Sequence, residues 1–212
     1  MFMGSIHPRP KHVVGERLAR AAMKHVYNDE SVGWTGPVFK GCTVNFGASR
    51  PPFCGHWIDV EFDSELLGDD ALLSWHPGNA LQLDSCTAPN QQANWSPMEV
   101  QFNNDTWISA FILSTSDLEH IDPAKVVEPG VLPAGYNKLS ISAMSPVGGA
   151  ANVTGIRWAW RDYPCCPQGN RDVVPCPPNS CTIKTVKSDL PAVPFMAKIV
   201  DGKCRCTPPM QC

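Results

Sequence analysis

The sequence lacks any long apolar run. No stretch of the 212 residues approaches the roughly 18 apolar residues of a membrane-spanning helix. Met1-Phe2-Met3 is followed at once by Gly4 and Ser5, without the apolar segment of a secretory signal. Charge is also sparse, at 17% of residues, and the 17 basic side chains are scattered. With a net charge of -3, this composition argues against a nucleic-acid partner, which usually needs clustered basic side chains. The lack of a long apolar run likewise predicts no membrane span.

Cysteine, by contrast, is abundant. The ten cysteines are Cys42, Cys54, Cys86, Cys165, Cys166, Cys176, Cys181, Cys204, Cys206 and Cys212. An even number in proline-rich, irregular sequence predicts disulfides made in an oxidising compartment, although sequence does not give their connectivity. A zinc site is the competing interpretation, but no CxxC pair occurs and no histidine lies near the C-terminal cysteines. We therefore expect disulfides, no metal and no cofactor.

Three N-glycosylation acceptor triplets point to the same compartment. They begin at Asn94, Asn104 and Asn152, and such triplets are modified on the surface of secreted proteins. Together with the cysteines they predict a secreted or lysosomal glycoprotein. Since no export signal accompanies these features, we expect the chain to be the C-terminal portion of a longer protein.

The hydrophobic pattern changes once along the chain. Apolar residues at helical spacing predict a helix over 12–27, ended by Asn28-Asp29. Alternation then predicts strands, each with one solvated face, and an apolar segment predicts a central strand. The alternating strands span 57–62, 98–102 and 138–143, the central strand spans 106–113, and a further strand spans 195–200. This pattern is typical of a mainly β fold, an antiparallel sandwich or jelly roll.

Two side-chain groupings on the predicted strands have structural and functional interpretations. Trp158 and Trp160 fall on one side of a strand, where two tryptophans more often fill a core than bind sugar. Asp59, Glu61 and Asp63 alternate along another strand. They are more typical of a solvated face than of a calcium site, because the spacing of a calcium-binding loop is absent.

The segment from Gly4 to Lys11 reads Gly-Ser-Ile-His-Pro-Arg-Pro-Lys and directly precedes the predicted helix. A histidine on such a loop can act as a general base. The alternative is that His7, one of six histidines in the chain and close to its start, has no special role. The segment resembles the one that closes the catalytic domain of the sialate O-acetylesterases. Further ordered matches are Gly36-Pro37, the Arg-Trp-Ala-Trp…Tyr-Pro-Cys run within 155–165, and Leu-Pro-Ala-Val-Pro-Phe at 190–195.

The resemblance covers residues 4 to about 199 and implies an ester hydrolase of the SGNH type. A serine would attack the acetyl ester of an O-acetylated sialic acid or glycoconjugate, with His7 as the general base. Residues 1–34 would then be the end of an α/β catalytic domain, and 35–212 a disulfide-rich antiparallel β domain packed on a missing N-terminal catalytic region. The family's Gly-Gln-Ser-Asn nucleophile motif is absent, as is a carboxylate before His7.

This departure keeps a second interpretation open. The chain could be a secreted, non-catalytic β domain that acts as a binding or structural module. No Gly-x-Ser-x-Gly elbow offers an alternative nucleophile, so we expect the isolated chain to hydrolyse no acetyl ester. A cysteine-rich metal-binding domain is a third, more remote interpretation.

Overall fold

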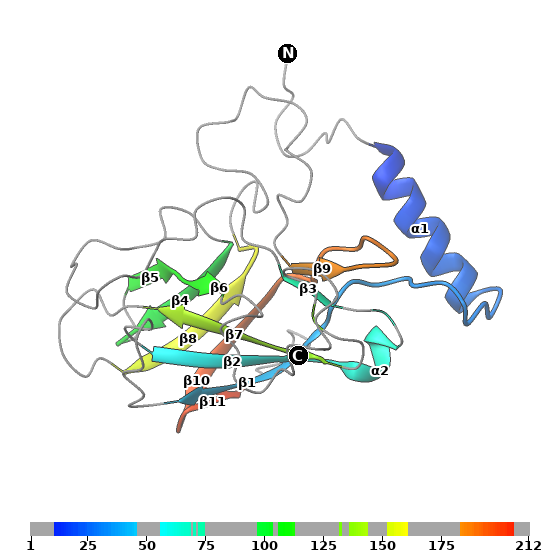
Figure 1. The fold of residues 1–212 in the computed structure, drawn as a ribbon. Helices are drawn as coiled ribbons and strands as arrows, with labels where there is room; N and C mark the ends of the chain where they lie inside the picture. The colour runs from blue at the N-terminus through cyan, green and yellow to red at the C-terminus, as the bar shows by residue number, and fades with distance from the viewer. Residues whose placement is uncertain are drawn as a thin grey trace, which may run out of the picture.

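The computed structural model describes ten stretches of the chain, and all structural statements below concern them. They are residues 11–45, 56–68, 70, 72–74, 97–103, 106–112, 132, 136–143, 152–160 and 183–205. Their fold is mainly β and antiparallel, as predicted (Figure 1). The strands form one large sheet curled into a half-barrel and one small two-stranded sheet. What the sequence predicted as two packed sheets is therefore, for the described strands, mainly one curled sheet.

Nine antiparallel strands make up the large sheet. In spatial order they are β5 (Thr106–Ser109), β4 (Met98–Phe102), β8 (Val153–Trp158), β10 (Phe195–Val200), β11 (Lys203–Arg205), β1 (Phe39–Asn45), β2 (His56–Phe62), β7 (Lys138–Ala143) and β6 (Phe111–Ile112). The small sheet pairs β3 (Leu72–Ser74) with β9 (Ile183–Thr185). Segments far apart in the chain lie side by side in both sheets, so the order of the strands does not follow the sequence.

The curl of the large sheet follows from one short link. Strands β5 and β6 lie at opposite edges of the sheet, yet only Ala110 separates them in the chain. The Ala110 N–H donates to the Met98 carbonyl oxygen at 2.9 Å, which holds the bend beside β4. The predicted central strand over 106–113 is thus wrong in position. This segment is apolar because it turns from one half of the sheet to the other and contributes to the core on the way, at Ile108 and Ala110.

Alternating side chains fill the inside of the curl, as the sequence predicted for β2. Ile58, Val60 and Phe62 are each 0% exposed, and β1 and β7 flank their strand on either side. The alternation fails on β4, where Glu99 is only 1% exposed. It was predicted to face water, but its carboxylate accepts a hydrogen bond from Arg157 Nε at 2.7 Å. This pairing supplies the partner that a buried charge requires.

Helix α1 (Lys11–His25) matches the predicted helix closely but stands apart from the large sheet (Figure 1). Strands β3 and β9 lie between the two. After α1, Asn28 adopts a left-handed conformation with φ 55°. The Ser31 hydroxyl and N–H both donate to the Asp29 carboxylate, and these bonds lower the pKa of Asp29. The predicted stop at Asn28-Asp29 is confirmed.

The second helix, α2 (Ser64–Leu67), is one turn long and is capped by Asp63, whose carboxylate accepts from the Glu65 and Leu66 N–H groups. Among the helices in the described stretches, none is long and apolar enough to cross a membrane.

Candidate functional site

Three of the four sequence segments that carry the family resemblance meet in one place. Gly36, the start of the Gly-Pro match, is buried against the backbone of 190–191. A Cβ built on Gly36 would lie 1.9 Å from the Pro191 carbonyl oxygen, so only glycine fits. The Val193 N–H donates to the Pro37 carbonyl oxygen at 3.0 Å. The segment 34–37 and the segment 190–194 are therefore locked together side by side.

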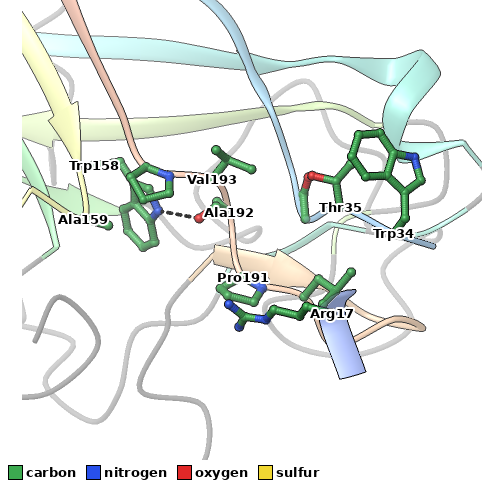
Figure 2. A pocket seen from close by; sticks show the side chains of 11 residues that line it. Arg17, Trp34, Thr35, Trp158, Ala159, Pro191, Ala192 and Val193 are labelled. Atoms are coloured by element: carbon green, nitrogen blue, oxygen red, sulfur yellow. Dashed lines mark hydrogen bonds between the residues drawn. The ribbon is translucent and has the colours of Figure 1, made fainter. Parts of the chain in front are cut away.

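The third matched segment closes the same cluster. Trp158, at the end of β8, is 0% exposed, and its indole Nε1 donates to the Ala192 carbonyl oxygen at 3.2 Å (Figure 2). Trp158 is also paired with Phe195 in the sheet. The prediction that Trp158 fills the core is confirmed. Trp160 does not accompany it, because Ala159 takes a positive φ of 56° and Trp160 is left 41% exposed.

A groove of about 360 Å³ opens beside this cluster, between it and α1. Its walls come from the three segments and from one helix residue, Arg17. Figure 2 shows Arg17 extending beside Pro191, with Trp34 and Thr35 on the other side of the groove. The Trp34 ring meets the His25 ring edge-on at a centroid distance of 4.4 Å. Arg17 begins the Arg-Leu-Ala stretch that follows the Gly4–Lys11 match, but no functional role was predicted for it. Trp34 belongs to none of the matched segments.

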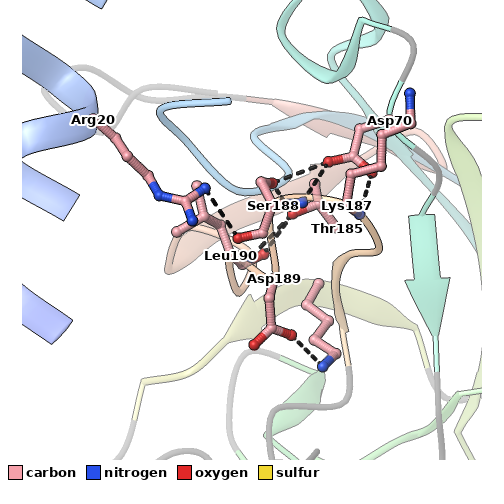
Figure 3. Close-up of polar contacts among 8 residues, drawn as sticks. Arg20, Asp70, Thr185, Lys187, Ser188, Asp189 and Leu190 are labelled. Atoms are coloured by element: carbon pink, nitrogen blue, oxygen red, sulfur yellow. Dashed lines mark hydrogen bonds and ion pairs between the residues drawn. The ribbon is translucent and has the colours of Figure 1, made fainter. Parts of the chain in front are cut away.

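Helix α1 contacts the turn after β9 through Arg20. One guanidinium nitrogen of Arg20 donates to the Ser188 carbonyl oxygen at 3.2 Å (Figure 3). The same nitrogen donates to the Gly33 carbonyl oxygen at 3.4 Å, and the other pairs with Glu16. Ser188 is held in turn by Asp70, which accepts from the Ser188 N–H at 3.1 Å and from its hydroxyl at 3.0 Å. The turn after β9, held by Asp70, thus binds α1 through the hydrogen bond from Arg20.

The opposite face of α1 is apolar and open. Val14 and Leu18, four residues apart on α1, are 48% and 67% exposed, and Val26, just after the helix, is 68% exposed. Residues four apart share one face of a helix, so Val14 and Leu18 lie on one face. Val26, eight residues after Leu18, continues this stripe just past the end of α1, where its N–H still donates to the Ala22 carbonyl oxygen at 2.8 Å. The hydrogen bonds of Arg20 orient the helix without covering this stripe.

The predicted catalytic histidine, His7, lies outside the described residues, so its prediction is untested. Of the described side chains, no serine hydroxyl hydrogen-bonds to a histidine. The Ser31, Ser140 and Ser188 hydroxyls contact Asp29, Asp59 and Asp70 instead. No completed nucleophile–base pair is present in the part of the chain that the structure describes.

One predicted disulfide is present. Cys42 on β1 and Cys204 on β11 are bonded, with their Cα atoms 4.9 Å apart. They lie next to the cross-strand pair Thr43–Lys203, so the bond joins two neighbouring antiparallel strands. The other eight cysteines lie outside the described residues. Within the described ranges, no cluster of three His, Cys, Asp or Glu side chains is arranged to hold a metal ion.

The acidic side chains of β2 have structural partners. The Asp59 carboxylate accepts from Trp57 Nε1 at 2.7 Å and from Asn45 Nδ2 at 2.9 Å. Glu61 lies 3.5 Å from the Lys40 ammonium and 3.4 Å from that of Lys138. These contacts agree with the predicted polar face of this strand.

Of the three predicted glycosylation acceptors, Asn152 is described, and Asn94 and Asn104 are not. Asn152 is exposed at the start of β8, and its backbone N–H donates to the Asn103 side-chain oxygen at 3.0 Å. Its side chain is therefore accessible to a glycosyltransferase on the folded surface.

No protein-family model matches the chain, and no curated protein sequence matches it significantly.

Proposed function

We propose that this chain is the C-terminal portion of a sialate O-acetylesterase-like enzyme of the SGNH type, acting in a secretory or lysosomal compartment. The proposal is supported by the convergence of three matched segments at one cluster. Gly36-Pro37, Trp158 and 190–195 are far apart in sequence, yet each contacts another directly. If these segments match the family because they form one structural unit, they are expected to contact one another in the folded chain.

The chemistry follows from the role proposed for His7. A serine supplied by an upstream part of the enzyme attacks the acetyl carbonyl of the sugar ester while His7 removes the hydroxyl proton. The resulting imidazolium then gives that proton to the departing sugar oxygen, so the sugar leaves as the free alcohol and an acetyl-serine remains. Water, deprotonated by His7, releases acetate from that intermediate and regenerates the serine. No metal or cofactor takes part in these steps.

The open stripe on α1 supports the domain division in this proposal. Val14, Leu18 and Val26 expose apolar surface that a helix in a finished domain normally buries. We assign residues 1–34 to the catalytic unit, with the stripe packed on its upstream part. The β domain, 35–212, would hold the helix through Arg20 and thereby the loop that carries His7.

A reconstituted enzyme tests the proposal. The gene sequence upstream of the Met1 codon is joined in frame to this chain, and acetate release from 9-O-acetyl-N-acetylneuraminic acid is measured. We expect turnover by the joined polypeptide, none by the chain alone, and loss of at least about a thousandfold in kcat for His7→Ala. His12→Ala is the matched control, because His12 is an exposed histidine in the first turn of α1.

A non-catalytic β module is the second candidate, favoured by the absence of a serine–histidine pair among the described side chains. If this candidate is right, the upstream sequence contains no Gly-Gln-Ser-Asn segment and the joined polypeptide releases no acetate. Turnover by the isolated chain that is abolished by His7→Ala would contradict both candidates, because it requires a nucleophile that neither includes.

A further inference from the structure

The groove beside α1 has the size and lining of a small-molecule site. Its volume of about 360 Å³ falls at the lower end of the range of roughly 300–1,000 Å³ that is usual for such sites. Apolar side chains of the 190–194 segment form much of its wall, and Arg17 is the one charged side chain in its lining. A mostly apolar groove with one oriented charge is suited to a small ligand with a flat apolar face and one anionic group.

Arg17 is available to such a ligand. It has no hydrogen-bond or ion-pair partner among the described residues, whereas its helix neighbours Arg20 and Lys24 pair with Glu16 and Glu30. No acidic side chain lines the groove, so nothing in the lining competes for the guanidinium. An arginine presents parallel N–H groups that match the two oxygens of a carboxylate.

Trp34 supplies a flat surface on the same groove. The edge-on contact with His25 fixes the orientation of its ring, and Trp34 is only half-buried. Trp158 cannot take this role, since it is fully buried and its indole N–H is already bonded to Ala192. The C–H face of a sugar ring packs well on an exposed indole, because both surfaces are apolar and flat.

We propose that this groove binds an acidic sugar, with the carboxylate on the Arg17 guanidinium and the apolar face of the pyranose ring on Trp34. The choice of a sugar rests on the proposed function, whereas the need for a carboxylate and a flat apolar ring rests on the groove alone. Arg17 lies about 9 Å along the helix axis from Lys11 at 1.5 Å per residue. One helix would therefore carry the carboxylate-binding group and follow directly from the loop of the expected general base.

An NMR titration of the isotope-labelled chain tests this site. The probe is N-acetylneuraminic acid, which bears no O-acetyl ester, and its neutral carboxyl-methyl ester is the comparison ligand. We expect the acid to shift the Trp34 indole resonance with a Kd in the millimolar range, as for a single charge-assisted contact plus one stacked ring. The methyl ester should bind at least about tenfold more weakly, because it cannot form the charged bidentate contact.

The variants separate the two contacts. Arg17→Gln should weaken binding of the acid about tenfold or more, and Trp34→Leu should weaken both ligands. Arg205→Gln is the matched control, because Arg205 is an exposed arginine on β11 outside the groove lining. Far-UV circular dichroism of each variant verifies that the fold is retained. Arg17→Lys, which keeps the charge and loses the two-pronged geometry, should give an intermediate affinity.

Three results would overturn the site: no shift of groove resonances up to roughly 20 mM acid, equal binding of acid and ester, or equal loss in the Arg17 and Arg205 variants. None of these measurements involves ester hydrolysis. Acetate release by the joined polypeptide without binding in the groove would overturn the groove as a sugar site and retain the esterase. Binding in the groove with no acetate release by the joined polypeptide would retain the site and overturn the esterase.

Discussion

Replacing Gly36 with alanine tests the packing of the functional cluster most directly. The added Cβ would lie 1.9 Å from the Pro191 oxygen, 2.6 Å from the Pro191 carbonyl carbon and 2.9 Å from the Leu190 oxygen. All three are backbone atoms, so no side chain can rotate away. Real Cβ contacts essentially never fall below 3.0 Å, and the segments must separate by at least 1.1 Å, the difference between 3.0 and 1.9 Å.

The expected loss of stability follows from what this separation breaks. Overpacking alone costs about 1–3 kcal/mol. The hydrogen bonds from Val193 to Pro37 and from Trp158 to Ala192 span the same contact region, and each contributes about 1 kcal/mol. We therefore expect Gly36→Ala to lower the free energy of unfolding by about 3–5 kcal/mol. At about 2–4 °C per kcal/mol for a chain of this size, the Tm should fall by roughly 6–20 °C.

Thermal unfolding followed by near-UV circular dichroism, with the disulfides kept oxidised, measures the change. Gly15→Ala is the matched control, because a Cβ at Gly15 meets nothing within 4 Å. It should not destabilise the chain, and in the helix interior alanine is favoured over glycine by about 1 kcal/mol. A Gly36→Ala variant as stable as the parent chain would refute the close approach of 34–37 to 190–194. It would also remove the observation on which the proposed function rests.

Three other perturbations have defined outcomes. Arg157→Met leaves the Glu99 carboxylate buried without its ion pair, so urea denaturation should show a loss of about 3–5 kcal/mol; a change below about 0.5 kcal/mol would contradict a structural ion pair. The double variant Cys42→Ala, Cys204→Ala should lose about 2–5 kcal/mol, and peptide mapping of the unreduced parent should recover the two cysteines in one linked peptide. Expressed through a secretory pathway, Asn152→Gln should lack one glycan that the parent loses on treatment with a glycosidase; a mass difference of only the added methylene group between the untreated proteins would show that Asn152 is unmodified.

Local patterns in the sequence were sufficient for much of the fold. The helix over 12–27 and the strands near 57–62, 98–102, 138–143 and 195–200 are present at nearly those bounds. Their periodicity reflects which face of each element is buried, and that signal is contained in neighbouring residues. Trp158 was assigned to the core on the same ground and is fully buried.

The failures arose where a distant segment decided the outcome. Residues 106–112 became two edge strands because the sheet curls and its edges meet at Ala110, which no local pattern contains. Strand alternation predicts that Glu99 is solvated. It is buried instead, because Arg157, 58 positions away in the sequence, forms an ion pair with it. Trp160 lies outside the core because the positive φ of Ala159 turns the backbone out of the strand conformation. Strand alternation does not predict such a turn.

By itself, the sequence determined the antiparallel β class and the helix, and it predicted disulfide bonding, of which Cys42–Cys204 is present, because each is set by composition or by residues close together in the chain. It also supplied the motifs on which the esterase proposal depends. Only the tertiary structure decided that Gly36, Trp158 and Pro191 form one cluster, that Cys42 pairs with Cys204, and that Arg17 and Trp34 line one groove. These are contacts between segments separated by up to 162 residues, and they exist only once the sheet has brought those segments together.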